Sequence, residues 1–572
     1  MRMSGSLLKC CSLLHSVCTL MVLLCLAQVV SGAESVSANF VAQEQARQGE
    51  RMYREGILPS GKPVQAFVRS DLAVQGTSFS CVSCHLRSGL GSVEGGVITP
   101  PTNGAKLFQP LQTLYRNTVQ NPKYFPAPPR RPAYTDDALA KVINEGIDPT
   151  GRVLNDVMPR YLLDGGDMAQ LIGYLKKLSA EFSPGVTESN IHFATVISAD
   201  VPPGDREAML APLRNFIAIK NNNVASFKRP SGARSHLMAE NMMAASRDLV
   251  HQTLSLAVWE LKGPPETWRS QLEKYNSTEP AFALIGGITS GEWGPIHAFT
   301  EEYKIPCLFP NTDFPVLSTT DWYTLYMSKG YYQEGEAAAR YLNNNRETTA
   351  DAAIVQIVRD SREGRALATG FQNTWSSLEH QQPVTITLKA GEEINSEMVR
   401  KNTVNGKPAV ILLWDGPEVM AGLEHLISAG NGKGIVIVSA GYLGKGIWSL
   451  KEQLRDRTYI TYPYRFPKAP LTYKPSNMAM GLRYFSPDAT KIENQTYSVI
   501  EVLSMALMDM RGNYYRDNFL DVIGMIMDQE VPLFERLSFG PGQRYASKGC
   551  YIVQLSKDAK PELIKKSDWV IH

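Results

Sequence analysis

The segment SFSCVSCHLRSGLG, residues 78–91, contains the side chains with the most specific chemistry in the sequence. Cys81 and Cys84 enclose two residues, and His85 follows directly. This C-x-x-C-H spacing is the attachment motif of a c-type haem, in which both thiols add across the haem vinyl groups and the histidine ligates the iron. We therefore predict one covalent haem c, held through Cys81 and Cys84, with His85 as an axial ligand of the iron.

Two other chemistries use the same residue types. A thioredoxin-like redox pair lies in a βαβ context, whereas the flanks of this motif are polar and rich in glycine. A structural zinc site needs a second pair of cysteine or histidine ligands nearby, and the sequence offers none before Cys307. The haem interpretation is also favoured because c-type haem is attached outside the cytoplasm, and the N-terminus described below predicts export.

An electron-carrying haem of this type needs a second axial ligand, and Met158 is the predicted one. It lies in GRVLNDVMPRYLLDGGD, residues 151–167, a polar and turn-rich segment from which a thioether can reach the iron. Core packing is the alternative role for Met158. Met52 and Met168 lie in expected helices, so core packing suits them better.

The residues around the motif predict helices. Residues 40–53 begin this region, Thr135 can cap a helix that ends at Gly146, and Asp167 can cap a helix with apolar residues at helical spacing from Leu171 to Leu178.

Residues 34–180, with the CVSCH motif, the Met-Pro loop and the final helix, resemble a class I cytochrome c domain. The resemblance implies an all-α domain that transfers electrons to or from a redox partner protein. It assigns the covalent links to Cys81 and Cys84 and the axial positions to His85 and Met158. The stretch from His85 to Met158 is longer than the family's pattern. Arg87, Arg130 and Arg131 could pair with the haem propionates or lie exposed on the surface.

The first 33 residues have the pattern of a signal peptide. Arg2 and Lys9 make a positive start, Leu20 to Val30 is apolar, and small residues follow at 31–33. A retained membrane anchor is the alternative, but the apolar run is shorter than the roughly 20 residues of a spanning helix. We expect a periplasmic or otherwise exported protein of bacterial type, with no transmembrane segment in the mature chain.

Charge and motifs exclude several function classes. The 572 residues include 58 basic and 56 acidic ones, which gives no basic excess for nucleic-acid binding. The sequence has no phosphate-binding loop, no H-E-x-x-H metalloprotease motif and no G-x-S-x-G nucleophile elbow. We expect an electron carrier rather than an enzyme, with no catalytic residues assigned.

After a polar linker at residues 181–190, the pattern changes to short apolar runs that alternate with helical stretches. The runs are IHFATVI, LSLAVWEL, AFALIGG, AAIVQIV, VTITL, AVILLWDG and GIVIVSAG. This alternation predicts doubly wound α/β sheets with crossover helices. Residues 191–572 are too many for one such sheet, so we predict two lobes.

Residues 191–572 resemble a type I periplasmic binding protein of the branched-chain amino-acid receptor kind. The segments that carry the resemblance are LIGGITSGEWGPIHAFTEEYKIPCLFPNTDFPVLS, YYQEGEAAARYL, IVRDSREGRALATGF and AVILLWDGPEVMAGL. The resemblance implies a small ligand between the lobes, an amino acid or small carboxylate. It assigns Ser290 and Thr312 to the ligand carboxylate, with Tyr331 and Asp415 as contacts from the second lobe.

Each of these residues also has a structural alternative. Ser290 and Thr312 could cap helices, and Asp415 could be an ordinary loop acid. Trp293 and Trp414 could line the cleft, although core packing is the default for tryptophan. Cys307 and Cys550 could form a disulfide in an oxidising compartment or remain two buried thiols.

The two halves together predict an exported c-type cytochrome for electron transfer with a fused solute-binding or sensing module. Two alternatives stay open: a haem-containing subunit of a periplasmic oxidoreductase, and a solute receptor for a transporter.

Overall fold

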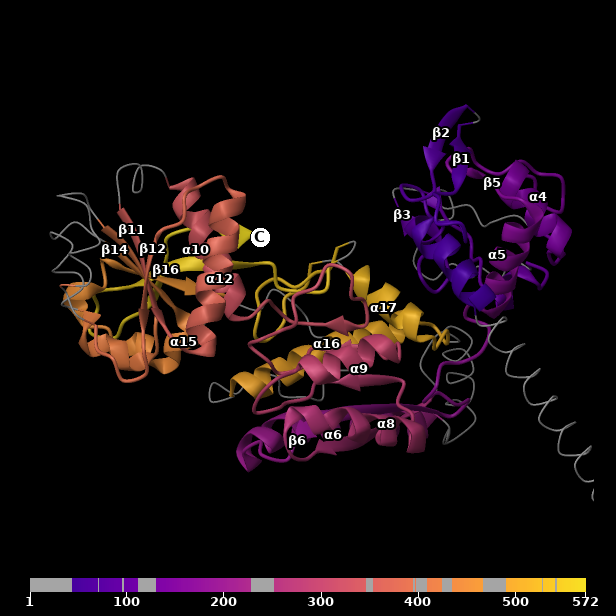
Figure 1. The fold of residues 1–572 in the computed structure, drawn as a ribbon. Helices are drawn as coiled ribbons and strands as arrows, with labels where there is room; N and C mark the ends of the chain where they lie inside the picture. Colours follow the sequence, from indigo (N-terminus) through magenta and orange to yellow (C-terminus); the bar gives the residue numbers. More distant parts are fainter. Residues whose placement is uncertain are drawn as a thin grey trace, which may run out of the picture. The chain divides into compact units, whose positions relative to one another are not determined.

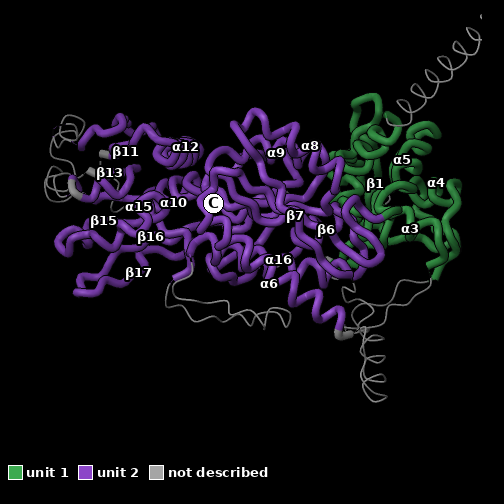
Figure 2. The backbone as a smooth tube through the Cα atoms, turned by 90° about the horizontal axis from the view of Figure 1, so that it is seen from below, with its two compact units in different colours: residues 1–181 green, residues 182–572 purple. Residues whose placement is uncertain are grey.

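The computed structural model describes residues 44–571, apart from 70, 95–96, 112–129, 228–251, 346–352, 395–396, 398–408, 424–434, 467–489, 527 and 541–542. The predicted signal peptide at residues 1–33 lies outside the described residues. The chain divides into two compact units, unit 1 with residues 1–181 and unit 2 with residues 182–572 (Figure 2).

The helices of unit 1 surround one apolar core. They are a helix described over residues 44–55, α2 (Val82–His85), α3 (Gly104–Leu107), α4 (Asp136–Glu145) and α5 (Gly165–Lys177). The cap at Thr135 is confirmed, because its side chain accepts a hydrogen bond from the Ala138 N–H at 3.2 Å. The cap of α5 is Asp164, which accepts from the Asp167 N–H at 2.8 Å, so the prediction of Asp167 was wrong by one turn.

Unit 1 also contains β-structure. Strand β1 (Gln65–Val68) pairs antiparallel with β2 (Leu72–Gln75) and with β5 (Arg160–Leu162), and β3 (Val93–Glu94) pairs with β4 (Val97–Ile98). The expectation of an all-α unit is therefore wrong. The chain reverses between β1 and β2, and this sheet turns the buried side chains of Ala66 and Tyr161 into the core of the unit.

The first lobe of unit 2 is built on a parallel sheet of order β10-β9-β8-β6-β7. Its strands are β6 (Asn190–Ser198), β7 (Thr253–Leu261), β8 (Ala283–Ile285), β9 (Cys307–Leu308) and β10 (Thr324–Leu325). Its helices are α6 (Pro203–Phe227), η1 (Pro265–Thr267), α8 (Trp268–Thr278), α9 (Gly294–Glu302), α16 (Lys491–Asp509) and α17 (Arg516–Gly524). The last two return from far along the sequence and share an apolar core with α6 and the sheet.

The second lobe has a mixed sheet of order β12-β11-β13-β14-β15-β16-β17, with β18 paired to β16. Its strands are β11 (Ala353–Arg359), β12 (Val384–Leu388), β13 (Ala409–Trp414), β14 (Ile435–Ser439), β15 (Thr458–Tyr462), β16 (Gly549–Leu555), β17 (Leu563–Lys565) and β18 (Val570–Ile571). Its helices are α10 (Tyr331–Asn344), α12 (Arg362–Ser377), α15 (Ala440–Leu443), η2 (Pro417–Ala421), η3 (Gly444–Ser449) and η4 (Glu452–Leu454). Two sheets with crossover helices confirm the predicted two lobes.

Two glycines set the distance between α10 and α12, which lie side by side on the second lobe (Figure 1). A Cβ on Gly335 would come within 2.1 Å of the Leu367 carbonyl oxygen, and one on Gly370 within 2.1 Å of the Tyr332 carbonyl oxygen. The close approach therefore requires glycine at both positions. It fixes the N-terminal end of α10, which begins at Tyr331.

Several core assignments made from the sequence are confirmed. Trp293 and Trp414 are buried in the lobes, and Met52 and Met168 are buried in unit 1. Among the residues that the structure describes, no helix combines the length and apolar character of a membrane span.

Candidate functional site

Unit 1 contains a partly open cavity beside the C-x-x-C-H motif. The lining residues are mostly apolar; they are Tyr53, Cys81, His85, Pro100, Pro101, Thr102, Leu107, Leu111, Arg131, Tyr134, Leu139, Val142, Ile143, Leu154, Met158, Tyr161, Leu171 and Leu175. The structure thus brings three predicted haem residues, Cys81, His85 and Met158, to one cavity.

His85 is held as a metal-ligating histidine would need to be. The ring is buried, and its Nδ1 lies 2.8 Å from the carbonyl oxygen of Pro100. A carbonyl can only accept, so Nδ1 carries the proton and Nε2 keeps its lone pair for a metal. Burial lowers the pKa of His85 to about 4, which keeps the imidazole neutral.

The two cysteines differ in position. Cys81 lines the cavity, and burial raises its thiol pKa to about 12. Cys84 is exposed and is not among the residues that line the cavity. Met158 lies in a turn. Its backbone N–H donates to the Asn155 carbonyl at 3.1 Å, and the Arg160 side chain donates to the Met158 carbonyl at 2.6 Å. These contacts hold the Met158 backbone and leave the thioether at the cavity wall.

Arg131 is a buried cation in the wall of this cavity, which the sequence left undecided. Its Nη1 donates to the carbonyls of Leu107, Gln109 and Pro132 at 3.2, 3.3 and 2.9 Å, and its Nη2 donates to that of Lys106 at 3.1 Å. The carbonyl dipoles stabilise the guanidinium without neutralising its charge. The cavity wall therefore combines mostly apolar side chains with a histidine, a methionine and a buried cation.

The second candidate site is a small, partly open polar pocket inside unit 2. It is lined by Thr312, Asp313, Met327, Ser328, Gly330, Tyr331, Glu334, Pro463, Tyr464, Lys491, Gln495 and Phe534. Tyr331 and Glu334 come from α10 of the second lobe, whereas Thr312 and Asp313 follow β9 of the first lobe. The pocket therefore lies where the two lobes meet.

Two predicted ligand residues, Thr312 and Tyr331, line this pocket, and the other two do not. The Ser290 hydroxyl donates to the Asp200 carboxylate, so it does not cap a helix. Hydrogen bonds from Ser198 and Ser290 lower the pKa of Asp200. A carboxylate next to Ser290 would therefore lie close to a negative charge.

Asp415 already has a charged partner. Arg359 donates to both of its carboxylate oxygens, at 2.8 Å from Nε and 2.6 Å from Nη2, and the Gly416 N–H adds a bond of 2.8 Å. This bidentate pair is buried on the aspartate side. The geometry gives Asp415 a structural role at the end of β13.

Glu334 is the acid that the structure directs into the pocket. It is only 2% exposed, and it accepts hydrogen bonds from the Thr461 hydroxyl at 2.6 Å and the Gly441 N–H at 3.1 Å. Burial raises the pKa of Glu334 to about 7 despite these bonds. The sequence analysis missed it. The available signal was an acid in line with Ala338 and Tyr341 on the apolar face of α10, at i, i+4 and i+7.

Opposite Glu334, Lys491 at the start of α16 donates to both carboxylate oxygens of Asp313, at 2.7 and 2.8 Å. The Tyr331 ring packs against Phe314, with centroids 5.3 Å apart, and against Tyr442, with centroids 6.0 Å apart. The pocket thus combines two carboxylates and one ammonium group with aromatic walls.

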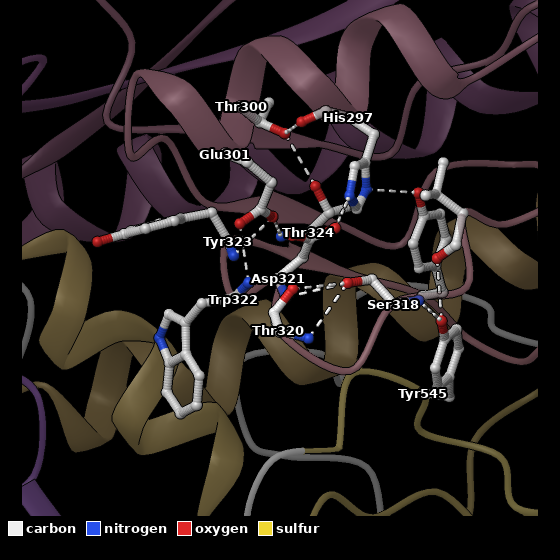
Figure 3. A network of polar contacts seen from close by, with 12 residues as sticks. His297, Thr300, Glu301, Ser318, Thr320, Asp321, Trp322, Tyr323, Thr324 and Tyr545 are labelled. Carbon is white, nitrogen blue, oxygen red and sulfur yellow. Dashed lines mark hydrogen bonds and ion pairs between the residues drawn. The ribbon is translucent and has the colours of Figure 1, made fainter. Parts of the chain in front are cut away.

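A buried network fixes the loop that carries Thr312 and Asp313 (Figure 3). This loop, residues 309–323, joins β9 to β10. The Glu301 carboxylate accepts the N–H groups of Trp322, Tyr323 and Thr324, each at 2.8 Å. His297 bridges Tyr326 and Asp321, with contacts of 2.9 Å at Nδ1 and 2.8 Å at Nε2. The second half of the loop is therefore anchored to α9.

Cys307 and Cys550, left open by the sequence, are both buried free thiols, in β9 of the first lobe and β16 of the second.

The sequence model of the family described as periplasmic binding protein matches residues 252–559, more than half of the chain. Similar solved structures include an extracellular ligand-binding receptor from Verminephrobacter eiseniae, with 14% identity, 65% of this chain and 99% of that chain covered, and a TM-score of 0.42. Another is an ABC transporter substrate-binding protein from Sphaerobacter thermophilus, with 11% identity, coverage of 67% and 98%, and a TM-score of 0.48.

A third is a branched chain amino acid ABC transporter from Thermus thermophilus with bound valine, with 10% identity, coverage of 68% and 98%, and a TM-score of 0.43. At these scores the likenesses carry no argument about the ligand of this chain. No curated protein matches the sequence. The family match confirms the resemblance predicted for the second half of the chain, whereas the cytochrome c resemblance of the first half stays a prediction.

Proposed function

Because the chain belongs to the periplasmic binding protein family, we propose that unit 2 is an exported solute receptor that binds a small molecule between its two lobes. The observation that carries this proposal is the pocket whose walls come from both lobes, with Thr312 on one side and Tyr331 on the other. A ligand that touches both walls would hold the lobes together, and its binding would stabilise the folded state.

A thermal-shift screen of the mature full-length protein tests this function. The screen contains amino acids, small carboxylates, small amines and neutral polyols at millimolar concentration. A receptor is expected to show a concentration-dependent rise in melting temperature with at least one class. If no class raises the melting temperature, the proposed receptor function is wrong.

We also propose that unit 1 is a c-type cytochrome domain, because its cavity presents His85, Met158 and Arg131 together. In this proposal Cys81 and Cys84 would tether the haem by thioether bonds, and the Nε2 of His85 and the thioether of Met158 would hold the iron. Arg131, in the cavity wall, would be the cation available to the acidic groups of the ring. The haem, when bound, supplies one-electron transfer, so the unit would exchange electrons with a redox partner protein.

Haem attachment is tested by producing the protein in a host competent in cytochrome maturation. The expected results are a pyridine haemochrome spectrum of c type and a polypeptide mass increased by one haem. A colourless product with the mass of the bare polypeptide would contradict the proposal and would leave the receptor function unaffected.

The two proposed functions are linked in one chain, and the link is measurable. A redox titration with and without a ligand from the thermal screen compares the potentials of the haem. A ligand-dependent potential would mean that solute binding regulates electron transfer, whereas an unchanged potential would mean that the units are only tethered.

A further inference from the structure

We propose that the pocket between the lobes binds the cationic group of a small organic amine, with Glu334 as its counter-charge, and that it discriminates against carboxylate ligands. This inference rests on the proposed receptor function and specifies its ligand class. Its support is the arrangement of the charged side chains of Glu334, Asp313 and Lys491 around the pocket.

The first observation is the isolation of Glu334. Its hydrogen-bond donors are neutral, the Thr461 hydroxyl and the Gly441 N–H, and no described residue forms an ion pair with it. Buried carboxylates in proteins are normally paired with a cation, because transfer from water without a counter-charge is costly. A ligand cation in the pocket would supply the missing partner.

The nearest cation on the pocket wall is already engaged. Lys491 donates to both oxygens of Asp313, so that pair has no net charge, although the Lys491 charge also lowers the pKa of Glu334. With Glu334 ionised, the pocket has an uncompensated negative charge. A positively charged ligand balances it, and a negatively charged one doubles the imbalance.

The aromatic walls fit the same ligand. Tyr331 and Tyr464 line the pocket with Glu334, and the Lys491 ammonium already lies 5.6 Å from the centroid of the Tyr464 ring. Aromatic faces attract ammonium groups at such distances. A small amine could therefore place its nitrogen near Glu334 and its carbon chain against the tyrosine rings.

The first lobe argues against a carboxylate ligand. Of the two residues that the family resemblance assigns to the carboxylate, Ser290 does not line the pocket and donates its hydroxyl to Asp200. The other, Thr312, accepts the Phe314 N–H at 3.1 Å and lies beside the acidic Asp313. A ligand carboxylate in the pocket would therefore lie beside Glu334 and Asp313, without the Ser290 hydroxyl as a donor.

Protonation of Glu334 gives the proposal a second readout. The titratable and charged groups around it come from its own helix and from four other places: Tyr331 on α10, Asp313 after β9, Tyr464 after β15, Lys491 on α16 and Cys550 on β16. Burial raises the pKa of Glu334 more than the hydrogen bonds and the Lys491 charge lower it, so the pKa is about 7. Amine binding should therefore weaken about tenfold per pH unit as the pH falls below 7.

The test is calorimetric titration of the full-length mature protein with two matched probes, butylammonium and butyrate. The variants are Glu334→Gln, which removes the charge in the pocket, and Glu336→Gln as the control. Glu336 is buried on the same helix, but it pairs with Lys329 at 2.9 Å and does not line the pocket. We expect butylammonium to bind the wild type and E336Q, and to bind E334Q at least tenfold more weakly. Its affinity for the wild type should follow the pH dependence given above. Butyrate should not bind.

Other outcomes overturn the inference. Equal butylammonium affinity in E334Q and the wild type, no heat with butylammonium at pH 8, or binding of butyrate in the pocket would each do so. If a carboxylate or neutral solute still raises the melting temperature in the wider screen, the receptor function stands and only the cation assignment fails. Should E334Q fold poorly, Glu334→Asp keeps the charge and is expected to retain a preference for butylammonium over butyrate.

Discussion

Glu334 should contribute a pH dependence of predictable size to the stability of unit 2. The folded-state pKa of Glu334 is about 7, whereas its ordinary value is 4.5. Between these values the folded protein holds a proton that the unfolded chain has released, so stability falls as pH rises. From pH 5 to pH 8 the loss is about 2.5 kcal/mol, obtained from the two pKa values at 1.36 kcal/mol per unit.

Glu334→Gln removes this titration. Relative to the wild type, the variant is therefore expected to gain about 2.5 kcal/mol in free energy of unfolding between pH 5 and pH 8. The burial of Glu334, which leaves 2% of it exposed, means that solvent screening reduces this figure little.

Urea unfolding followed by tryptophan fluorescence measures the effect in the full chain. All eight tryptophans lie in residues 182–572, so the signal reports unit 2 alone. Glu452→Gln, at an exposed position of the same unit, is the control and should keep the pH profile of the wild type. If the profiles of E334Q and the wild type run parallel from pH 5 to pH 8, the assignment of a raised pKa to Glu334 is refuted.

Three further predictions concern single positions. In the haem-loaded protein, Met158→Ala should abolish the thioether-to-iron absorption band, whereas the core variant Met168→Ala should keep the band and lose about 2–5 kcal/mol of stability; a band that survives Met158→Ala would show that another residue ligates the iron. Glu301→Gln should cost unit 2 about 1–3 kcal/mol in urea unfolding, because one of its three backbone donors loses its acceptor; an unchanged midpoint would mean that the loop is held by other contacts. Gly441→Ala should destabilise unit 2 by about 1–3 kcal/mol, because its Cβ would lie 2.4 Å from a Glu334 carboxylate oxygen. A double-mutant cycle with Glu334→Ala should remove most of that cost, and additive effects would contradict the contact.

Much of the fold could be predicted from local patterns. The apolar runs located seven strands of unit 2, namely β6, β7, β8, β11, β12, β13 and β14, because a buried strand imposes its own period on the sequence. The cap at Thr135 followed from hydrogen bonding within one turn. The small sheet of unit 1 was missed because its strands are three or four residues long, and β5 comes from a distant segment.

In the candidate sites, too, some features followed from the sequence and others only from the tertiary structure. The sequence by itself predicted the chemistry of the C-x-x-C-H motif, because two thiols and an imidazole at fixed spacing need no distant partner to be recognised; haem attachment there stays a prediction. Only the tertiary structure decided that Arg131 is buried in the wall of that cavity, that Asp415 pairs with Arg359, and that Glu334 faces a pocket. The bond from Thr461 to Glu334 joins residues 127 positions apart, and no local periodicity encodes such a contact. The sequence gives the type of each side chain. The burial and the partners of that side chain set its pKa and its function, and they depend on which distant segments the fold brings beside it.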